Sequence, residues 1–450
     1  NSKVIIRSLV AAPVFNLEEL KGLIEWEAVE RFEEGFDVNV DGFRRRLVDA
    51  RSREQLLKLY DELQRAEPRK GYPYREPTDW REILSERPAS PPRFSVELDG
   101  RELYDRVLGA WLGRCAGCML GKPVEGWSRE RIERALRRAD EYPLRKPYFP
   151  LAAFLDLGEE QLRWIKPLTR EHIGRAERDD DLDYTVLNLL VYERRGPRFT
   201  TNDVAEAWLS LLPYHLTYTA ERAAYRNLVL GLRPPETATY LNPFREWIGA
   251  QIRADLWGYV SPGDPGRAAE LAYRDARLSH VKNGVYGEMM VAAMLSLAYV
   301  IDSPREIVRE ALKVIPERSR LAEAVRYVLN LHSKGVEWEE AIGEVLSRYG
   351  RYHPVHTINN AAVVVAALLW GEGDFARTVI YAVTAGLDTD CNGATAGSIV
   401  GLMQGASRLP REWIDPLRGK LATALSGYGE LSIEELAERT AKCAIAHLER

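Results

Sequence analysis

The chain has 450 residues, of which 46% are hydrophobic and 29% are charged; this balance is typical of a folded globular protein and excludes wholesale disorder. Its formal net charge is −5, which argues against a nucleic-acid-binding protein, because such proteins carry a basic surplus. Four cysteines are too few for a dense disulfide framework in a chain of this length, so we expect a reducing, cytoplasmic location.

Residues 1 to about 65 predict helices. Apolar positions recur at helical spacing in LEELKGLIEWEAVERFEEGF and in FRRRLVDARSREQLLKLYDELQRA. The stretch from Glu67 to Pro92 is rich in proline and charge, and a long helix does not tolerate prolines at these intervals. This stretch is either an extended linker that wraps onto the next unit or a loop inside one domain. We therefore predict a helical extension with a Pro-rich linker over residues 1–95 and a main domain over residues 96–450.

From Leu98 onward the segments again repeat apolar residues with a helical period, and neither a hairpin signal nor a strand-helix alternation is evident. The sequence therefore predicts an all-α protein. Two of these helices carry small residues spaced by about four, which predicts either very close helix packing or a backbone that approaches a ligand. The small residues are Gly109, Gly113, Gly117, Gly121, Gly393, Ala396, Gly397 and Gly401.

Two short acidic clusters each precede a predicted helix. The first runs from Asp179 to Asp183, and the second contains Asp388 and Asp390 in GLDTDCNGATAGS. Neighbouring carboxylates repel one another unless a cation is shared between them, and hard cations such as Mg²⁺ prefer carboxylate oxygens. With seven histidines in the chain, we expect oxygen rather than nitrogen ligands. The alternative is that both clusters only cap their helices, where negative charge is favoured.

Together with a further stretch, these clusters resemble motifs of the ADP-ribosylglycohydrolases, in particular the dinitrogenase-reductase-activating type. GAWLGRCAGCMLGKPVEG resembles the opening glycine-rich motif and contains, next to its last residue, Glu125, where many members have a functional glutamate. ERDDDLDYTV places Asp180 and Asp181 on the two aspartates of the T-D-D-T motif, and GLDTDCNGATAGSIVG places Asp388 and Asp390 on the closing D-x-D motif.

A fourth stretch, IGAQIRADLWGYVSPGDP, is similar to the motif that lines the substrate cleft of the family and keeps Gly249 and Arg253. The four motifs occur in the order of the family and extend over about Leu98 to Arg450. The resemblance implies an ADP-ribosylglycohydrolase-like helical bundle with one or two Mg²⁺ or Mn²⁺ ions at the base of a cleft. The metal ligands that it implies are Asp179, Asp180, Asp181, Asp388, Asp390 and Cys391.

The chain departs from the family pattern at several of these positions. Cys118 replaces the aspartate of the opening motif, Asp179 replaces the first threonine of T-D-D-T, and Cys391 stands where threonine or serine often supplies a ligand. Ile248 and Ile252 replace the asparagine and methionine of the cleft motif. The ion-binding residues are thus retained, whereas the walls that recognise ADP-ribose are altered.

Two loops supply further candidate substrate contacts. By the resemblance, Ser279, His280 and Asn283 lie near a loop that faces the cleft; the alternative is that the histidine only caps a helix. In VHTINNAAVV, His356, Asn359 and Asn360 precede an apolar helix, and they either face the same cleft or cap that helix.

The resemblance implies a metal-dependent hydrolase that cleaves an anomeric N- or O-glycosidic bond of an ADP-ribosyl or related ribosyl substrate, with Glu125, Asp180 and Asp390 as catalytic residues. Two alternatives remain open: a hydrolase of another glycoside or nucleoside-like substrate, and a non-catalytic protein that binds a nucleotide or ADP-ribose. We expect a small-molecule or ADP-ribosylated substrate as the partner. We expect no nucleic acid as a partner, because the net charge is negative. We also expect no membrane as a partner, because the longest apolar run, Ala361 to Trp370, is too short to cross a bilayer.

Overall fold

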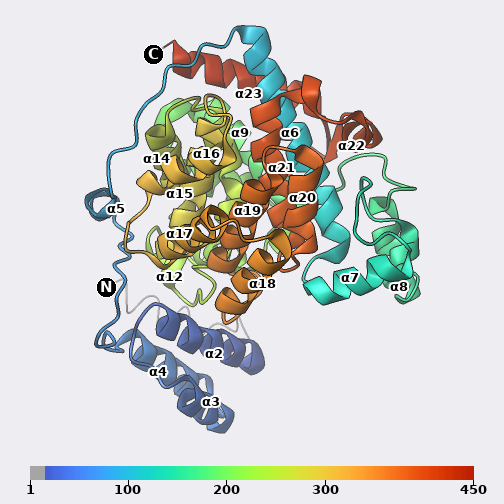
Figure 1. Cartoon of the computed structure of the whole chain (residues 1–450). Coiled ribbons are helices and arrows are strands. Elements are labelled where there is room, and N and C mark those ends of the chain that lie inside the picture. The colour runs from blue at the N-terminus through green and yellow to red at the C-terminus, as the bar shows by residue number, and fades with distance from the viewer. Residues whose placement is uncertain (1–15, 450) are drawn as a thin grey trace.

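The computed structural model describes residues 16–449, and helices make up almost all of the regular structure in this range (Figure 1). The only strands within it are β1 (Lys420–Ala422) and β2 (Glu430–Ser432), which form one antiparallel pair. The all-α prediction is therefore confirmed, although no pattern in the sequence indicated this short hairpin. None of the helices between residues 16 and 449 combines the length and the apolar character needed to cross a membrane.

Helices α2 (Leu17–Glu33), α3 (Val40–Asp49) and α4 (Arg53–Gln64) form the N-terminal extension, below the main body in Figure 1. The apolar periodicity alone predicted α3 and α4 as one continuous helical stretch. The chain breaks between them because Ser52 caps α4: its side chain accepts a hydrogen bond from the backbone N of Gln55 at 3.3 Å. The small hydrophobic core of the extension also contains Leu241 of the main body, so the two parts are packed together.

The linker runs along one side of the main body, from the extension to the start of α6 (Figure 1). It contains one short helix that the sequence analysis did not predict, α5 (Trp80–Glu86), which Asp79 caps. Polar contacts fasten the linker at both ends: Arg75 donates its backbone N–H to Arg318 O at 2.9 Å, and Phe94 donates to Gly263 O at 2.8 Å.

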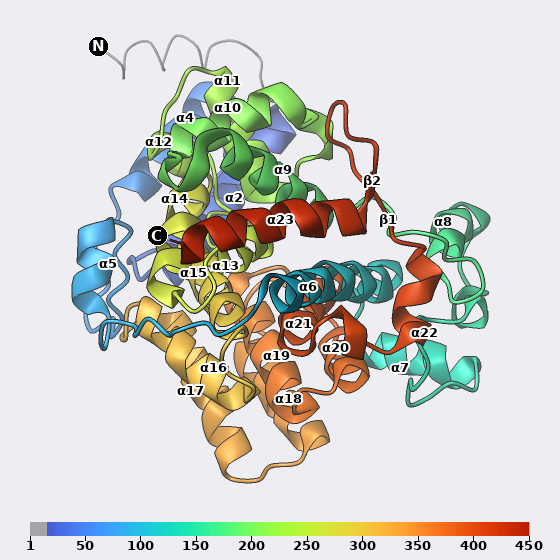
Figure 2. The ribbon, with the colours of Figure 1, turned by 90° about the horizontal axis from the view of Figure 1, so that it is seen from above.

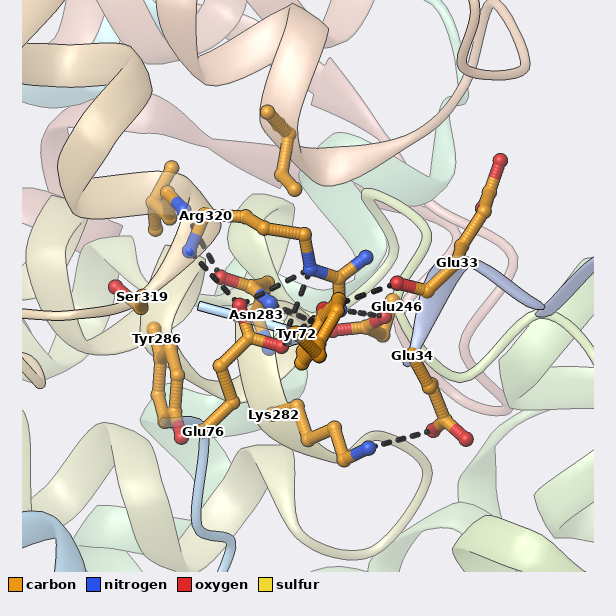
Figure 3. Close-up of polar contacts among 12 residues, drawn as sticks. Glu33, Glu34, Tyr72, Glu76, Glu246, Lys282, Asn283, Tyr286, Ser319 and Arg320 are labelled. Carbon is orange, nitrogen blue, oxygen red and sulfur yellow. Dashed lines mark hydrogen bonds and ion pairs between the residues drawn. The ribbon is translucent and has the colours of Figure 1, made fainter. Parts of the chain in front are cut away.

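A buried ion network fixes the extension and the linker to the main body (Figure 3). The Arg320 guanidinium pairs with Glu76 of the linker at 2.8 Å and with Glu246 of the main body at 2.5 Å. Lys282 Nζ lies 3.6 Å from Glu34 at the end of α2. Because removing one member of a buried pair leaves an uncompensated charge, this network holds the extension in a defined position.

The main body is a bundle of helices (Figures 1 and 2). The helices that the apolar periodicity predicts are α6 (Gly100–Gly121), α9 (Asp180–Arg195), α10 (Thr201–Leu211), α14 (Pro265–Ala276), α15 (Lys282–Leu297), α17 (Arg320–Ser333), α18 (Trp338–Tyr349), α19 (Thr357–Gly371), α20 (Phe375–Thr384), α21 (Thr389–Gln404) and α23 (Ile433–Leu448). Shorter helices that it does not predict are α7 (Arg129–Arg138), α8 (Glu159–Ile165), α11 (Thr219–Val229), α12 (Glu236–Thr239), α13 (Asp255–Tyr259), α16 (Pro304–Ala311) and α22 (Arg411–Ile414).

The glycine-rich helices α6 and α21 run antiparallel in direct backbone contact. Gly113 faces the carbonyl of Gly397, and Gly117 faces that of Gly393, so closely that a Cβ atom on any of these glycines would overlap the facing backbone. The prediction of very close helix packing is therefore confirmed. As a consequence, the C-terminal end of α6 lies beside the N-terminal end of α21, where the second acidic cluster begins.

Candidate functional site

The second acidic cluster occupies the start of α21. Asp388 is the N-cap residue, but its side chain makes no capping hydrogen bond to any residue that the structure describes. The backbone of this turn is held by Asn360, whose Oδ1 accepts hydrogen bonds from Asp388 N at 3.2 Å and from Asn392 Nδ2 at 2.8 Å. The carboxylates of Asp388 and Asp390 are therefore oriented by their surroundings without being used to cap the helix.

The first acidic cluster divides into three roles. Asp179 caps α9 by accepting a hydrogen bond from Asp181 N at 3.0 Å, so the capping interpretation holds for this residue. Asp180 faces a cavity. Asp181 points into the protein interior, where Arg114 of α6 donates to its Oδ1 at 3.1 Å.

Glu125 lies beside the second acidic cluster and belongs to a third segment of the chain. After α6 and the short turn η1 (Lys122–Val124), Gly126 N donates to Leu387 O at 3.0 Å, which joins this segment to the turn before α21. Glu125, Asp388 and Asp390 consequently each place a carboxylate oxygen within 4.8 Å of the others. Three segments that are distant in the sequence thus build one cluster of acids.

These acids line a cavity of about 930 Å³. Its rim carries basic and aromatic side chains, among them Arg163, Trp164, Arg178 and Tyr218, and Ile248 and Ile252 lie in one wall. The volume falls in the range of small-molecule sites. The residues predicted from the sequence that line it are Glu125, Asp179, Asp180, Gly249, Asp388, Asp390 and Cys391.

Burial and repulsion between the carboxylates raise the pKa values of Glu125, Asp388 and Asp390. The Asp390 carboxylate, together with burial, raises the pKa of Glu125 to about 8. Burial raises the pKa of Asp390 to about 6, with a further contribution from Asp179. Burial and Asp390 raise the pKa of Asp388 strongly. Such shifts indicate that a bound positive charge would stabilise the ionised carboxylates.

The donor set fits a hard divalent cation. Asp181 Oδ2 and Asp390 Oδ1 are buried and have no hydrogen-bond partner among residues 16–449, and a buried carboxylate oxygen without a partner is costly. A second group of potential ligand atoms within 4.8 Å of one another consists of Asp181, Asp390 and Cys391. Burial raises the pKa of the Cys391 thiol, and sulfur is a poor ligand for a hard cation.

Arg253, Ser279 and His280 do not reach the cavity. Arg253 is fully buried and donates to Glu221 at 2.8 Å and to Ser279 Oγ at 2.8 Å. Ser279 Oγ in turn lies 2.8 Å from Nδ1 of His280. The structure therefore corrects their interpretation as substrate contacts: Arg253 holds Glu221, and it is Glu221 that lines the cavity.

Asn283 and Asn359 also lie away from the cavity lining. Asn283 donates to Glu246 Oε1 through its backbone N at 2.9 Å and through its Nδ2 at 2.8 Å. Asn359 Nδ2 donates to His353 O at 3.0 Å. The neighbouring Asn360 is the residue that contacts the acidic turn, so the substrate-binding assignment of Asn359 is corrected as well.

Two basic residues near the acids were not predicted from the sequence. Lys122 forms an ion pair with Asp179, and Arg114 forms ion pairs with Asp181 and with Asp255. Both basic residues belong to the glycine-rich stretch that contains Glu125. Their sequence signal was a basic residue within an otherwise apolar, glycine-rich segment, where a charge needs a partner.

The chain is similar to one known family and to two individual proteins. The sequence model of the ADP-ribosylglycohydrolase family matches residues 99–447. An uncharacterized protein of Archaeoglobus fulgidus is 25% identical over 312 residues, which make up 69% of this chain and 90% of that protein. A solved structure described as an "ADP-ribosylglycohydrolase-related protein complex" is 20% identical, with a TM-score of 0.48 and coverage of 77% of this chain and 99% of that one.

Proposed function

The chain belongs to the ADP-ribosylglycohydrolase family, and we propose that it hydrolyses the anomeric N- or O-glycosidic bond of an ADP-ribosyl or related ribosyl substrate with the help of Mg²⁺ or Mn²⁺. Membership of this family supports a glycohydrolase activity. The observation that carries the proposal is the convergence of Glu125, Asp180, Asp388 and Asp390 on one cavity.

The cation would be held by the carboxylates of the acidic clusters, chiefly Asp388 and Asp390. Carboxylate oxygens are the ligands that Mg²⁺ and Mn²⁺ prefer, and Asp390 Oδ1 has no other partner among the described residues. When bound, a divalent cation supplies positive charge that orients hydroxyl groups and lowers the pKa of coordinated water.

Glu125 is the residue to which we assign proton transfer. Its carboxyl group lines the cavity beside Asp390, where it would donate a proton to the leaving atom or accept one from the attacking water. Asn360 fixes the turn of Asp388, and Ile248 and Ile252 contribute apolar side chains to the cavity lining.

Hydrolysis assays on a panel of substrates test the proposal. ADP-ribosyl-arginine, ADP-ribosyl-serine, nucleosides and simple glycosides are each incubated with Mg²⁺ or Mn²⁺ and again with a chelator. We expect turnover of a ribosyl substrate that the chelator abolishes. Calorimetry on the double variant Asp388→Asn/Asp390→Asn should show loss of cation binding. Asp156→Asn, which alters an aspartate with 48% side-chain exposure, serves as the control that retains it.

The results that contradict the proposal are equally specific. Turnover that survives the chelator, or cation affinity that survives the double substitution, contradicts the cation site. Cation and nucleotide binding without any turnover identifies a binding protein instead of an enzyme.

A second candidate is the same chemistry on another glycoside or nucleoside-like substrate. The presence of Ile248 and Ile252 in the cavity lining favours it, because these apolar side chains offer no hydrogen bond to a polar substrate group. The assay panel separates the two candidates through the ratio of kcat/KM between ADP-ribosyl and other substrates.

A further inference from the structure

A lysine ammonium group lies inside the acidic cluster. Lys122 Nζ pairs with Asp179 Oδ2, and the two side chains are only 12% and 3% exposed. The ring of Trp164 lies 5.7 Å from the same ammonium and adds a cation–π contact. Lys122 also lines the cavity together with Glu125, Asp388 and Asp390.

The backbone at Lys122 is fixed beside the acids. The preceding residue, Gly121, packs against the backbone of Thr389 and Asp390 so closely that a Cβ would overlap it. The Thr389 hydroxyl donates to Gly121 O at 2.8 Å. The lysine side chain therefore starts from a point at the edge of the cluster that the packing of α6 on α21 determines.

The Lys122 ammonium donates a hydrogen bond directly to the Asp179 carboxylate, and both side chains are largely buried. Lys122 and Asp179 thus form a complete buried ion pair, and a cation bound to Asp179 would have to displace the ammonium.

The other acids differ in whether a basic side chain pairs with their carboxylate oxygens. Asp181 shares one of its oxygens with Arg114. Glu125, Asp388 and Asp390 keep a group of oxygens within 4.8 Å of one another. Asp179 is also the position at which the chain has an additional negative charge relative to the family pattern, and Lys122 supplies the charge that balances it.

Resting on the proposed function, we propose that Lys122 takes the place of a second metal ion, so that the site binds a single Mg²⁺ or Mn²⁺ through Asp388 and Asp390 and not through Asp179. An ammonium beside Asp179 repels a divalent cation from that half of the cluster. The chain therefore binds one ion, although its two acidic motifs suggest sites for two.

Counting bound Mn²⁺ per chain tests this inference without reference to activity. The full chain, freed of metal, is titrated with Mn²⁺ by equilibrium dialysis and electron paramagnetic resonance. We expect one Mn²⁺ in the natural protein and in Lys122→Arg, and two in Lys122→Met. Lys146→Met, which removes a lysine with 67% side-chain exposure, should still bind one.

Each other outcome has a distinct meaning. Two ions in the natural protein overturn the inference but leave the proposed cation-dependent function intact. No bound ion overturns both the cation dependence and the inference. A single ion, or none, in folded Lys122→Met shows that Lys122 does not take the place of an ion.

A second pair of variants covers the case in which Lys122→Met does not fold. If Asp179 is the lysine's partner and not a ligand, Asp179→Asn should weaken Mn²⁺ binding by less than about 10-fold, whereas Asp390→Asn should weaken it by more than about 100-fold. Equal losses in the two variants would make Asp179 a ligand and overturn the inference.

Discussion

Replacing Gly117 by alanine tests whether the contact between α6 and α21 builds the site. A Cβ at Gly117 would overlap the carbonyl of Gly393, and the nearest atoms belong to the backbone, which cannot rotate away. Overpacking of this kind costs about 1–3 kcal/mol, and rigid backbone on both sides places this position at the upper end or beyond. Alanine has a higher helix propensity than glycine, and this difference offsets about 1 kcal/mol of the cost. We therefore expect Gly117→Ala to lower the free energy of unfolding by about 2 kcal/mol.

Urea unfolding followed by circular dichroism measures this change, and Gly343→Ala is the matched control. Gly343 lies on the exposed face of α18, and a Cβ there meets no atom within 4 Å. The same substitution should therefore raise the free energy of unfolding by up to about 1 kcal/mol. Opposite signs are the expected result. If Gly117→Ala were as stable as Gly343→Ala, the backbone contact of the two helices would be refuted, together with the placement of Asp390 that depends on it.

Three further changes probe other parts of the molecule. Burial raises the pKa of Glu33 to about 7 despite the opposing charge of Arg320, so its contribution to stability is fully present below the ordinary pKa of 4.5 and is lost as the pH rises through 7; the thermal midpoint should fall over this window, and less so in Glu33→Gln. Arg253→Met leaves the carboxylate of Glu221 buried without its ion pair and should cost about 3–5 kcal/mol in urea unfolding; a cost below about 1 kcal/mol would refute the pairing. Asn360→Ala removes the acceptor for Asp388 N and should weaken Mn²⁺ binding about 10-fold by calorimetry; unchanged affinity would show that the amide does not position this turn.

The sequence predicted those parts of the fold that depend on local pattern. Apolar residues at helical spacing located the long helices, and glycines spaced by four indicated that α6 and α21 each pack very closely, without revealing that they pack on each other. The pattern failed where an element was short or mostly charged. Strands β1 and β2 have three residues each, and α7 buries only Ile132, Ala135 and Leu136, which leaves too few apolar positions to define a period.

At the site, the acids could be predicted because each cluster is contiguous and lies at the start of a helix. The partners of the acids could not, because Lys122 meets Asp179, and Arg114 meets Asp181, only through the crossing of α6 with α9. Arg253 illustrates the opposite error. Its presence in a motif that lines a cleft did not reveal on which side of the wall its side chain lies, and the structure places it behind Glu221.

The N-terminal extension stands directly behind one wall of the cavity. Trp26 of α2 packs edge-on against Trp247 at 5.5 Å between ring centroids and against His353 at 5.1 Å, and these two rings stack on each other at 4.1 Å. Ile248, which directly follows Trp247, and Val355, which follows His353 after Pro354, are joined by a hydrogen bond of 2.9 Å from Ile248 N to Val355 O, and both line the cavity. Aromatic contacts of this kind add to the free energy of burial, and the ion network of Figure 3 fixes the same helix at its C-terminal end. Folding of the extension and the shape of this wall are therefore coupled, because the atoms that position Ile248 and Val355 are packed against α2.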